Sequence, residues 1–101
     1  MNTIGEYKYH VVKFLENPFK ETERVSCGYV CVPKSWVTWC SPEDNIVRVW
    51  YPTQDPSNII EKKVRKREKK SDQWESFLSV LKYSTDIYEE AKIYILNKKN
   101  S

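Results

Sequence analysis

The chain has 101 residues, which fits one domain spanning residues 1–101, with 40% hydrophobic and 14% aromatic residues and a formal net charge of +3. Its two glycines cannot form a glycine-rich phosphate loop, so nucleotide-binding folds built on such loops are excluded. No apolar run reaches the roughly 18 residues of a membrane-spanning helix and no secretory signal is present, so we expect an intracellular protein with no membrane partner.

The positive charge is concentrated in one segment of the chain. Residues 61–70 (EKKVRKREKK) carry seven basic and two acidic side chains, a net charge of +5, whereas the remainder carries −2. Such a run can be a phosphate-binding patch, a nuclear import signal, or a solvated segment without a partner.

Three strands are predicted in the first half of the chain, over residues 7–15, 24–33 and 46–51. β-Branched and aromatic residues dominate all three, and turn-forming residues or prolines bound them. Gly28, in the middle of the second, indicates a bulge or a close approach of another backbone. Trp36 follows in a short turn or extended piece and is expected to be a core anchor.

A basic helix is expected to begin at Ile59 and to run toward Lys70. Ile60 and Val64 are spaced to pin its first turns to the sheet. Beyond Val64 nothing apolar remains to be buried, so residues 65–70 are expected to project into solvent or to be disordered.

The segment 72–83 is ambiguous between helix and strand. Trp74, Phe77, Leu78 and Leu81 follow helical spacing better than they follow strand alternation, so periodicity favours a helix.

The clearest helix is the last one, from Ile87 to about Lys98. Asp86 and Glu89 match a capping box at its start, and lysines at its end favour the helix dipole.

These elements predict an α+β fold. We expect a small antiparallel sheet of three or four strands, a C-terminal helix packed on it, and a basic loop or helix, residues 62–72, inserted before the last strand. Residues 1–6 and 98–101 are expected to fray.

Several short motifs occur in an order known from one family. The motifs are Val11-Val12-Lys13-Phe14, Val32-Pro33-Lys34-Ser35-Trp36, Trp50-Tyr51-Pro52, Trp74, Val80-Leu81-Lys82-Tyr83 and Tyr88-Glu89-Glu90-Ala91-Lys92. In this order the chain resembles the small N-terminal domain of many arthropod proteins of poorly defined function, several of them transposon-related or chromatin-associated. The family usually has Trp-Pro-Pro where this chain has Tyr51-Pro52-Thr53. The resemblance implies a strand over 77–82, a protein-interaction or chromatin-associated role, and no catalytic residues.

Enzymatic and metal-dependent functions are not expected. The chain has three cysteines, and this odd number argues against a disulfide framework. With His10, the residues Cys27, Cys31 and Cys40 could supply four zinc donors, but they lack the closely spaced pairs that are usual in zinc sites. We therefore expect free thiols, no metal, no cofactor and no catalytic residue.

The leading functional prediction is a non-enzymatic module that recruits a protein partner in the nucleus through its sheet edge or an aromatic surface. The residues proposed for that surface are Trp36, Trp39, Trp50 and Tyr51. A sharper version has them forming a methyl-lysine cage. Trp36 is expected to be core, and Trp39 is expected to be the most exposed of the four.

The alternative prediction is binding of DNA or RNA, without reading sequence, through the basic run. Its members are Lys62, Lys63, Arg65, Lys66, Arg67, Lys69 and Lys70. They would neutralise backbone phosphates. The same residues also fit a nuclear localisation signal, so a nuclear location is predicted, with the cytoplasm as the alternative.

Overall fold

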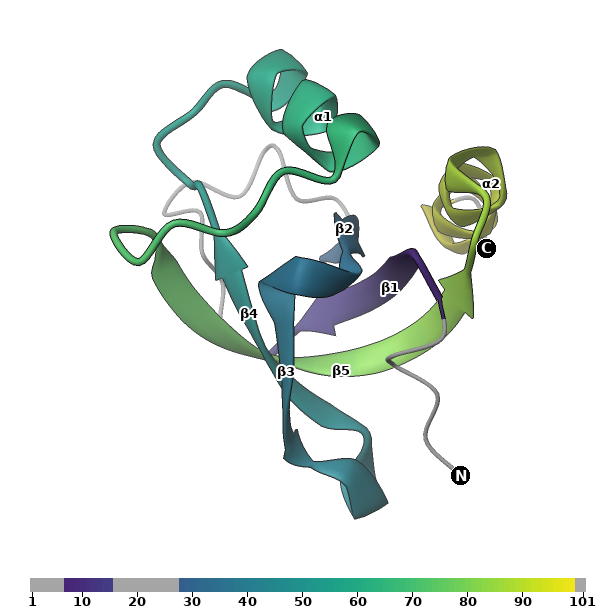
Figure 1. The fold of residues 1–101 in the computed structure, drawn as a ribbon. Helices are drawn as coiled ribbons and strands as arrows, with labels where there is room; N and C mark the ends of the chain where they lie inside the picture. Colours follow the sequence, from purple (N-terminus) through teal and green to yellow (C-terminus); the bar gives the residue numbers. More distant parts are fainter. Residues whose placement is uncertain (1–6, 16–27, 100–101) are drawn as a thin grey trace.

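The computed structural model describes residues 7–15 and 28–99, and its framework is a five-stranded antiparallel sheet (Figure 1). In chain order the elements are β1 (Tyr9–Phe14), β2 (Tyr29–Pro33), the 3₁₀ turn η2 (Lys34–Trp36), β3 (Val37–Ser41), the 3₁₀ turn η3 (Pro42–Asp44), β4 (Ile46–Tyr51), α1 (Ser57–Lys66), β5 (Glu75–Thr85) and α2 (Tyr88–Lys99). The strand order is β2-β1-β5-β4-β3. The α+β class is confirmed, with more strands than the three or four expected.

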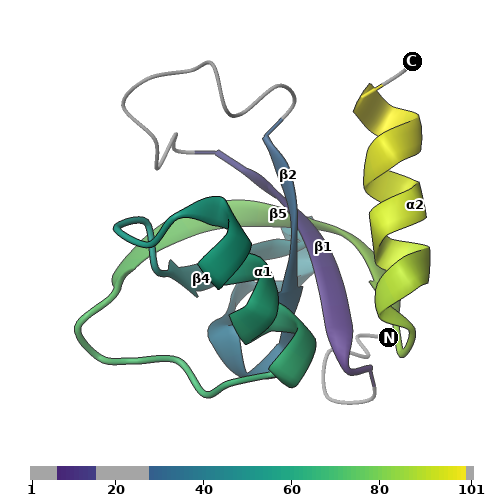
Figure 2. The same ribbon diagram turned by 90° about the horizontal axis from the view of Figure 1, so that it is seen from above.

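Both helices lie on the same side of the curved sheet (Figures 1 and 2). α2 packs on β2, β1 and β5, and α1 contacts β2. The two edge strands, β2 and β3, follow each other in sequence through η2. The curvature and this short connection bring the chain just after β2 close to the end of α1.

The strand that sequence reasoning missed is β3. It is short, Thr38 and Cys40 on it are exposed, and among the described strands it pairs only with β4. Its strand conformation therefore depends on that partner.

The prediction of a helix over residues 72–83, which periodicity favoured, is wrong. Most of this region lies in the strand β5, which extends beyond the 77–82 implied by the family resemblance. Residues 75–80 of β5 pair with β4 and residues 79–85 pair with β1, so each part of the strand has a partner. This tertiary constraint overrides the helical spacing of its apolar residues.

Burial differs between the central strands. On β4, Val47, Val49 and Tyr51 are buried and the alternate residues are half-buried, as in a strand that turns one face to the core. On β1 the successive residues 9–12 are all buried, because β1 lies between β2 and β5 and the β1–β5 register shifts between Val11 and Val12.

Gly28 precedes β2 instead of lying inside a strand. Its φ of +76° is a conformation that glycine favours, and its carbonyl accepts a hydrogen bond from the Phe14 amide at 3.1 Å. The earlier part of the predicted strand, residues 24–27 with Cys27, lies outside the described residues.

The start of α2 is held by neighbours of the predicted capping pair. Thr85 Oγ1 donates to Glu90 Oε1 at 2.6 Å and accepts from the Ile87 amide at 3.1 Å. Asp86 Oδ1 accepts the Lys8 amide at 3.0 Å and so ties the helix start to the residue before β1. At the other end the helix runs to Lys99.

Aromatic rings fill the centre of the core. Trp36 is fully buried and makes edge-on contacts with Trp74, at 4.9 Å between ring centroids, and with Tyr51, at 6.0 Å. Tyr51 contacts Phe14 in the same way at 5.3 Å. Each such pair adds about 0.5–1.5 kcal/mol beyond the burial of its area. The expectation that Trp36 anchors the core is confirmed.

We expect the Trp36→Ala variant to lose about 3–5 kcal/mol of unfolding free energy, because it leaves a cavity where a complete indole was buried. Urea titration followed by circular dichroism measures the loss. The exposed Thr38→Ala should change the stability by less than about 0.5 kcal/mol. Equal, small losses for both variants would contradict the assignment of Trp36 to the core.

Candidate functional site

The basic segment begins as a regular helix with two faces. Ile60 and Val64 are buried, as their spacing predicted, and hold α1 against the sheet. The basic side chains of α1 (Lys62, Lys63, Arg65 and Lys66) occupy other positions of the helix. The apolar contacts therefore set which way the charges point.

The helix ends at Lys66, and the chain turns sharply at Arg67. Arg67 is in the left-handed region with φ 54° and ψ 47°. Its amide donates to the Val64 carbonyl at 3.0 Å, and the Glu68 amide donates to the Lys63 carbonyl at 3.1 Å. This pair of bonds is a Schellman motif, which satisfies carbonyls at the helix end.

Two core aromatics donate hydrogen bonds to the backbone at the end of α1. The Tyr9 hydroxyl donates to the Arg65 carbonyl at 3.1 Å, and the Trp36 indole Nε1 donates to the Glu68 carbonyl at 2.6 Å. Residues 65–70 were expected to project into solvent or to be disordered, and the exposed side chains of residues 65–69 fit the first of these alternatives. The second does not hold, because buried donors position the backbone. Composition alone gives no sign of such bonds.

Three of the seven basic residues have partners inside the molecule. Lys63 lies 3.4 Å from Asp55 Oδ2, Arg65 lies 4.0 Å from Glu61 Oε2, and Lys70 lies 3.4 Å from Asp72 Oδ1. Each also lies over an aromatic ring: Lys63 over Trp74, Arg65 over Tyr88 and Lys70 over Trp50. These three charges belong to the fold.

The other four basic residues are exposed and make no ion pair within residues 7–15 and 28–99. They are Lys62, Lys66, Arg67 and Lys69, and together we call them the α1 basic surface. Lys62 and Lys66 are one helical turn apart, and Arg67 and Lys69 follow the helix end. These four charges are available to an anionic partner.

Glu61 connects the two helices beside this surface. Its Oε2 accepts from the Tyr88 hydroxyl at 3.0 Å and lies 3.7 Å from Lys92 Nζ. The Tyr88 hydrogen bond, followed by the charge of Lys92, lowers the pKa of the Glu61 carboxyl. Burial, followed by the same bond to Glu61, raises the pKa of the Tyr88 hydroxyl. The contact therefore pairs a charged carboxylate with a neutral phenol at neutral pH.

The four aromatics predicted to bind a partner do not share one exposed surface. Trp36 and Tyr51 are buried, with 0% and 7% of their surfaces exposed, and they leave no ring face for a partner. Trp50 is half-buried beneath Lys70, whose Nζ lies 4.6 Å from the ring centroid, and Trp39 is half-buried on β3. A methyl-lysine cage needs several open ring faces around one cation, and these four residues do not supply them.

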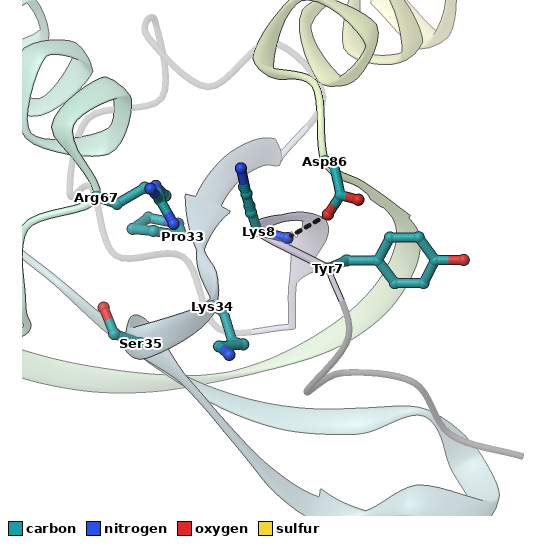
Figure 3. Close-up of a pocket in the computed structure, with 7 residues that line it drawn as sticks. All are labelled: Tyr7, Lys8, Pro33, Lys34, Ser35, Arg67 and Asp86. Atoms are coloured by element: carbon teal, nitrogen blue, oxygen red, sulfur yellow. Dashed lines mark hydrogen bonds between the residues drawn. The ribbon is translucent and has the colours of Figure 1, made fainter.

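Two cations that sequence reasoning did not single out lie close to the end of α1. Lys8, before β1, and Lys34, in η2, line the same pocket as Arg67 (Figure 3). They are distant from residues 61–70 in the sequence and isolated there, so no charge run marks them.

The described residues considered for zinc binding or catalysis do not form a site. His10 is a strand residue on β1; it is fully buried, and its Nδ1 lies 2.8 Å from Ser84 Oγ. Cys31 is buried and Cys40 is exposed, while Cys27 lies outside the described residues. Within the described part of the chain, no three histidine, cysteine or acidic side chains gather where they could hold a metal ion.

Comparisons with protein-family models, with curated proteins and with solved structures found no match to this chain. The resemblance to the arthropod N-terminal domain therefore stays a prediction. Neither α1 nor α2 is long and apolar enough to cross a membrane, and no other helix of that kind occurs in the described residues.

The two described cysteines should differ in reactivity. Burial raises the pKa of the Cys31 thiol to about 12, so almost no thiolate exists there at pH 8, whereas Cys40 is exposed. In a Cys27→Ser background, mass spectrometry should find rapid iodoacetamide labelling at Cys40 and labelling at Cys31 only after denaturation. Rapid labelling of Cys31 in the native protein would contradict its burial beneath α2.

Proposed function

We propose that the protein binds the phosphate backbone of DNA or RNA through the α1 basic surface, without reading sequence. The observation that carries the proposal is the division of the basic run. Three of its charges are paired within the fold, whereas Lys62, Lys66, Arg67 and Lys69 are exposed, have no ion pair within the described part of the chain and stand on an anchored backbone.

An anchored backbone favours binding over a merely solvated charge run. Cations on a disordered segment lose conformational freedom when they order against a phosphate backbone, and that loss weakens binding. The bonds from Tyr9 and Trp36 to the end of α1 remove much of this cost before any ligand arrives. Counterion release from the phosphates then supplies most of the affinity.

A second proposal, recruitment of a protein partner, is favoured by one observation. β3 lies at the edge of the sheet formed by the described strands and pairs there with β4 only, so an extended peptide could add to its outer side. Trp39 on this strand would contact such a peptide. Partners recovered with Trp39→Ala should then differ from those recovered with wild type and with the control Thr38→Ala, and identical recovery would count against this function.

We also propose a nuclear location, because the exposed cations of the same surface fit a basic import signal. A fluorescent fusion in which Lys62, Lys66 and Lys69 are replaced by Gln separates this use from binding. Loss of nuclear accumulation with unchanged nucleic-acid binding would show that the segment is an import signal and not a binding surface.

The wild-type protein should bind a short generic duplex at low salt, with an affinity that falls as salt rises. The triple variant Lys62/Lys66/Lys69→Gln should bind more weakly, and the slope of log K against log salt should become less steep by roughly one for each phosphate that the variant no longer neutralises. Fluorescence anisotropy across a salt series measures both quantities.

The matched control replaces three lysines elsewhere, Lys13, Lys82 and Lys98, by Gln. It changes the net charge equally, so a much smaller decrease in affinity is expected. Absence of binding by the wild type at low salt, or equal decreases for the two triple variants, would overturn the proposed function.

A further inference from the structure

A pocket of about 380 Å³ opens where four segments that are far apart in the sequence meet. Its lining residues are Tyr7, Lys8, Pro33, Lys34, Ser35, Arg67 and Asp86. They carry three positive charges and one negative charge. In Figure 3 the side chain of Arg67 lies next to Pro33, the side chain of Lys8 stands between Pro33 and Asp86, and the side chain of Lys34 points away from Arg67 and Lys8.

Hydrogen bonds between these segments build the frame of the pocket. The Lys34 amide donates to the Lys8 carbonyl at 3.0 Å, so η2 is attached to the residue before β1. The Trp36 indole donates to the Glu68 carbonyl at 2.6 Å, which attaches η2 to the residue after Arg67. The pocket is thus formed before a ligand binds, as small-ligand sites usually are.

The acid among the described lining residues is already engaged. Asp86 Oδ1 accepts the backbone amide of Lys8 at 3.0 Å, and no ion pair within the described ranges joins Asp86 to the ammonium of Lys8 or to Arg67. Like charges brought to one concavity repel one another and create a positive potential there. A bound anion would relieve that repulsion.

The backbone at Arg67 is a second, independent observation. Its φ of 54° lies in the left-handed region, where a side chain costs roughly 1 kcal/mol and glycine is the usual residue at a helix end. Strain of this kind tends to occur at functional positions. Here it places a guanidinium, the side chain best suited to gripping a phosphate with two hydrogen bonds, at the mouth of a positive pocket.

We propose that this pocket, which we call the Arg67 pocket, binds one phosphate group of the nucleic-acid backbone. Arg67 is the principal ligand, and Lys8 is the second cation on its side of the pocket. The inference rests on the proposed function and deepens it: the α1 basic surface attracts the backbone as a whole, and the Arg67 pocket fixes the position of one phosphate.

The decisive variant is Arg67→Gly, because it separates binding from folding. Glycine takes the left-handed conformation at no steric cost, so the melting temperature should stay the same or rise. Duplex affinity should nevertheless fall at least tenfold at low salt, and the salt slope should become less steep by roughly one. The control Lys69→Gln removes one charge from the same segment and should cost about threefold or less, as a rim cation.

Titration with inorganic phosphate, followed by ¹H–¹⁵N NMR at constant ionic strength, tests the pocket without nucleic acid. The amides of Lys8, Ser35 and Arg67 should shift saturably in the wild type, whereas the shifts at Lys8 and Ser35 should fail to saturate in Arg67→Gly. Chloride should produce no saturable shift in either protein.

The outcomes distinguish this inference from the proposed function. Absence of duplex binding by the wild type overturns both, even if phosphate saturates the pocket, because the phosphate would then come from another source. Duplex binding with equal decreases in affinity for Arg67→Gly and Lys69→Gln, or without saturable phosphate shifts, overturns the Arg67 pocket alone.

Discussion

The hydrogen bond from the buried indole of Trp36 to the carbonyl of Glu68 is the interaction on which the arrangement of the basic segment depends. It joins the aromatic core to the backbone just after α1, over a distance of 2.6 Å. Such a bond contributes only about 0.5–1.5 kcal/mol to stability, but its geometric effect is larger than its energy. Because Trp36 is fully buried, the position of Glu68, and with it that of Arg67, is set by the core.

The basic and aromatic parts of the chain consequently form one structure instead of two. Lys63, Arg65 and Lys70 lie over Trp74, Tyr88 and Trp50, so these three charges of the basic run contribute cation–π interactions to the fold. Of the aromatics predicted to bind a partner, Trp36 and Tyr51 are buried and Trp50 lies beneath Lys70, whereas Trp39 is half-buried on β3. On α1 and the turn after it, positive charge is exposed on a backbone that core donors hold in place, and this favours the proposal of phosphate binding over that of aromatic recognition.

Sequence patterns were informative where a segment's burial depends on its own residues. The strand over residues 46–51, the burial of Ile60 and Val64 and the core position of Trp36 were all predicted correctly. Patterns failed where neighbours decide the outcome. β3 is a strand because β4 pairs with it, and β5 is a strand because β4 and β1 pair with successive parts of it, despite helical spacing of its apolar residues.

The candidate site could be predicted only in part for the same reason. The charge run at 61–70 identified the α1 basic surface, but Lys8 and Lys34 reach the Arg67 pocket through the strand order and the η2 connection, which no local pattern encodes. The left-handed turn is at Arg67 and not at a glycine, so the sequence does not indicate it. It is recognised only in the structure, from the Schellman hydrogen bonds and from the bond of the Trp36 indole to the Glu68 carbonyl.

Amide hydrogen exchange at Arg67 and Glu68 tests most directly whether the core holds the end of α1. In the wild type both amides should be protected, because they donate to Val64 and Lys63. In Trp36→Phe, which keeps an aromatic ring but removes the indole donor, their exchange should accelerate by about five- to tenfold relative to that of Val49, as expected when one hydrogen bond is removed. Exchange of these amides in the wild type at the rate of an unstructured chain, or equal protection in both proteins, would contradict a helix end held by the core.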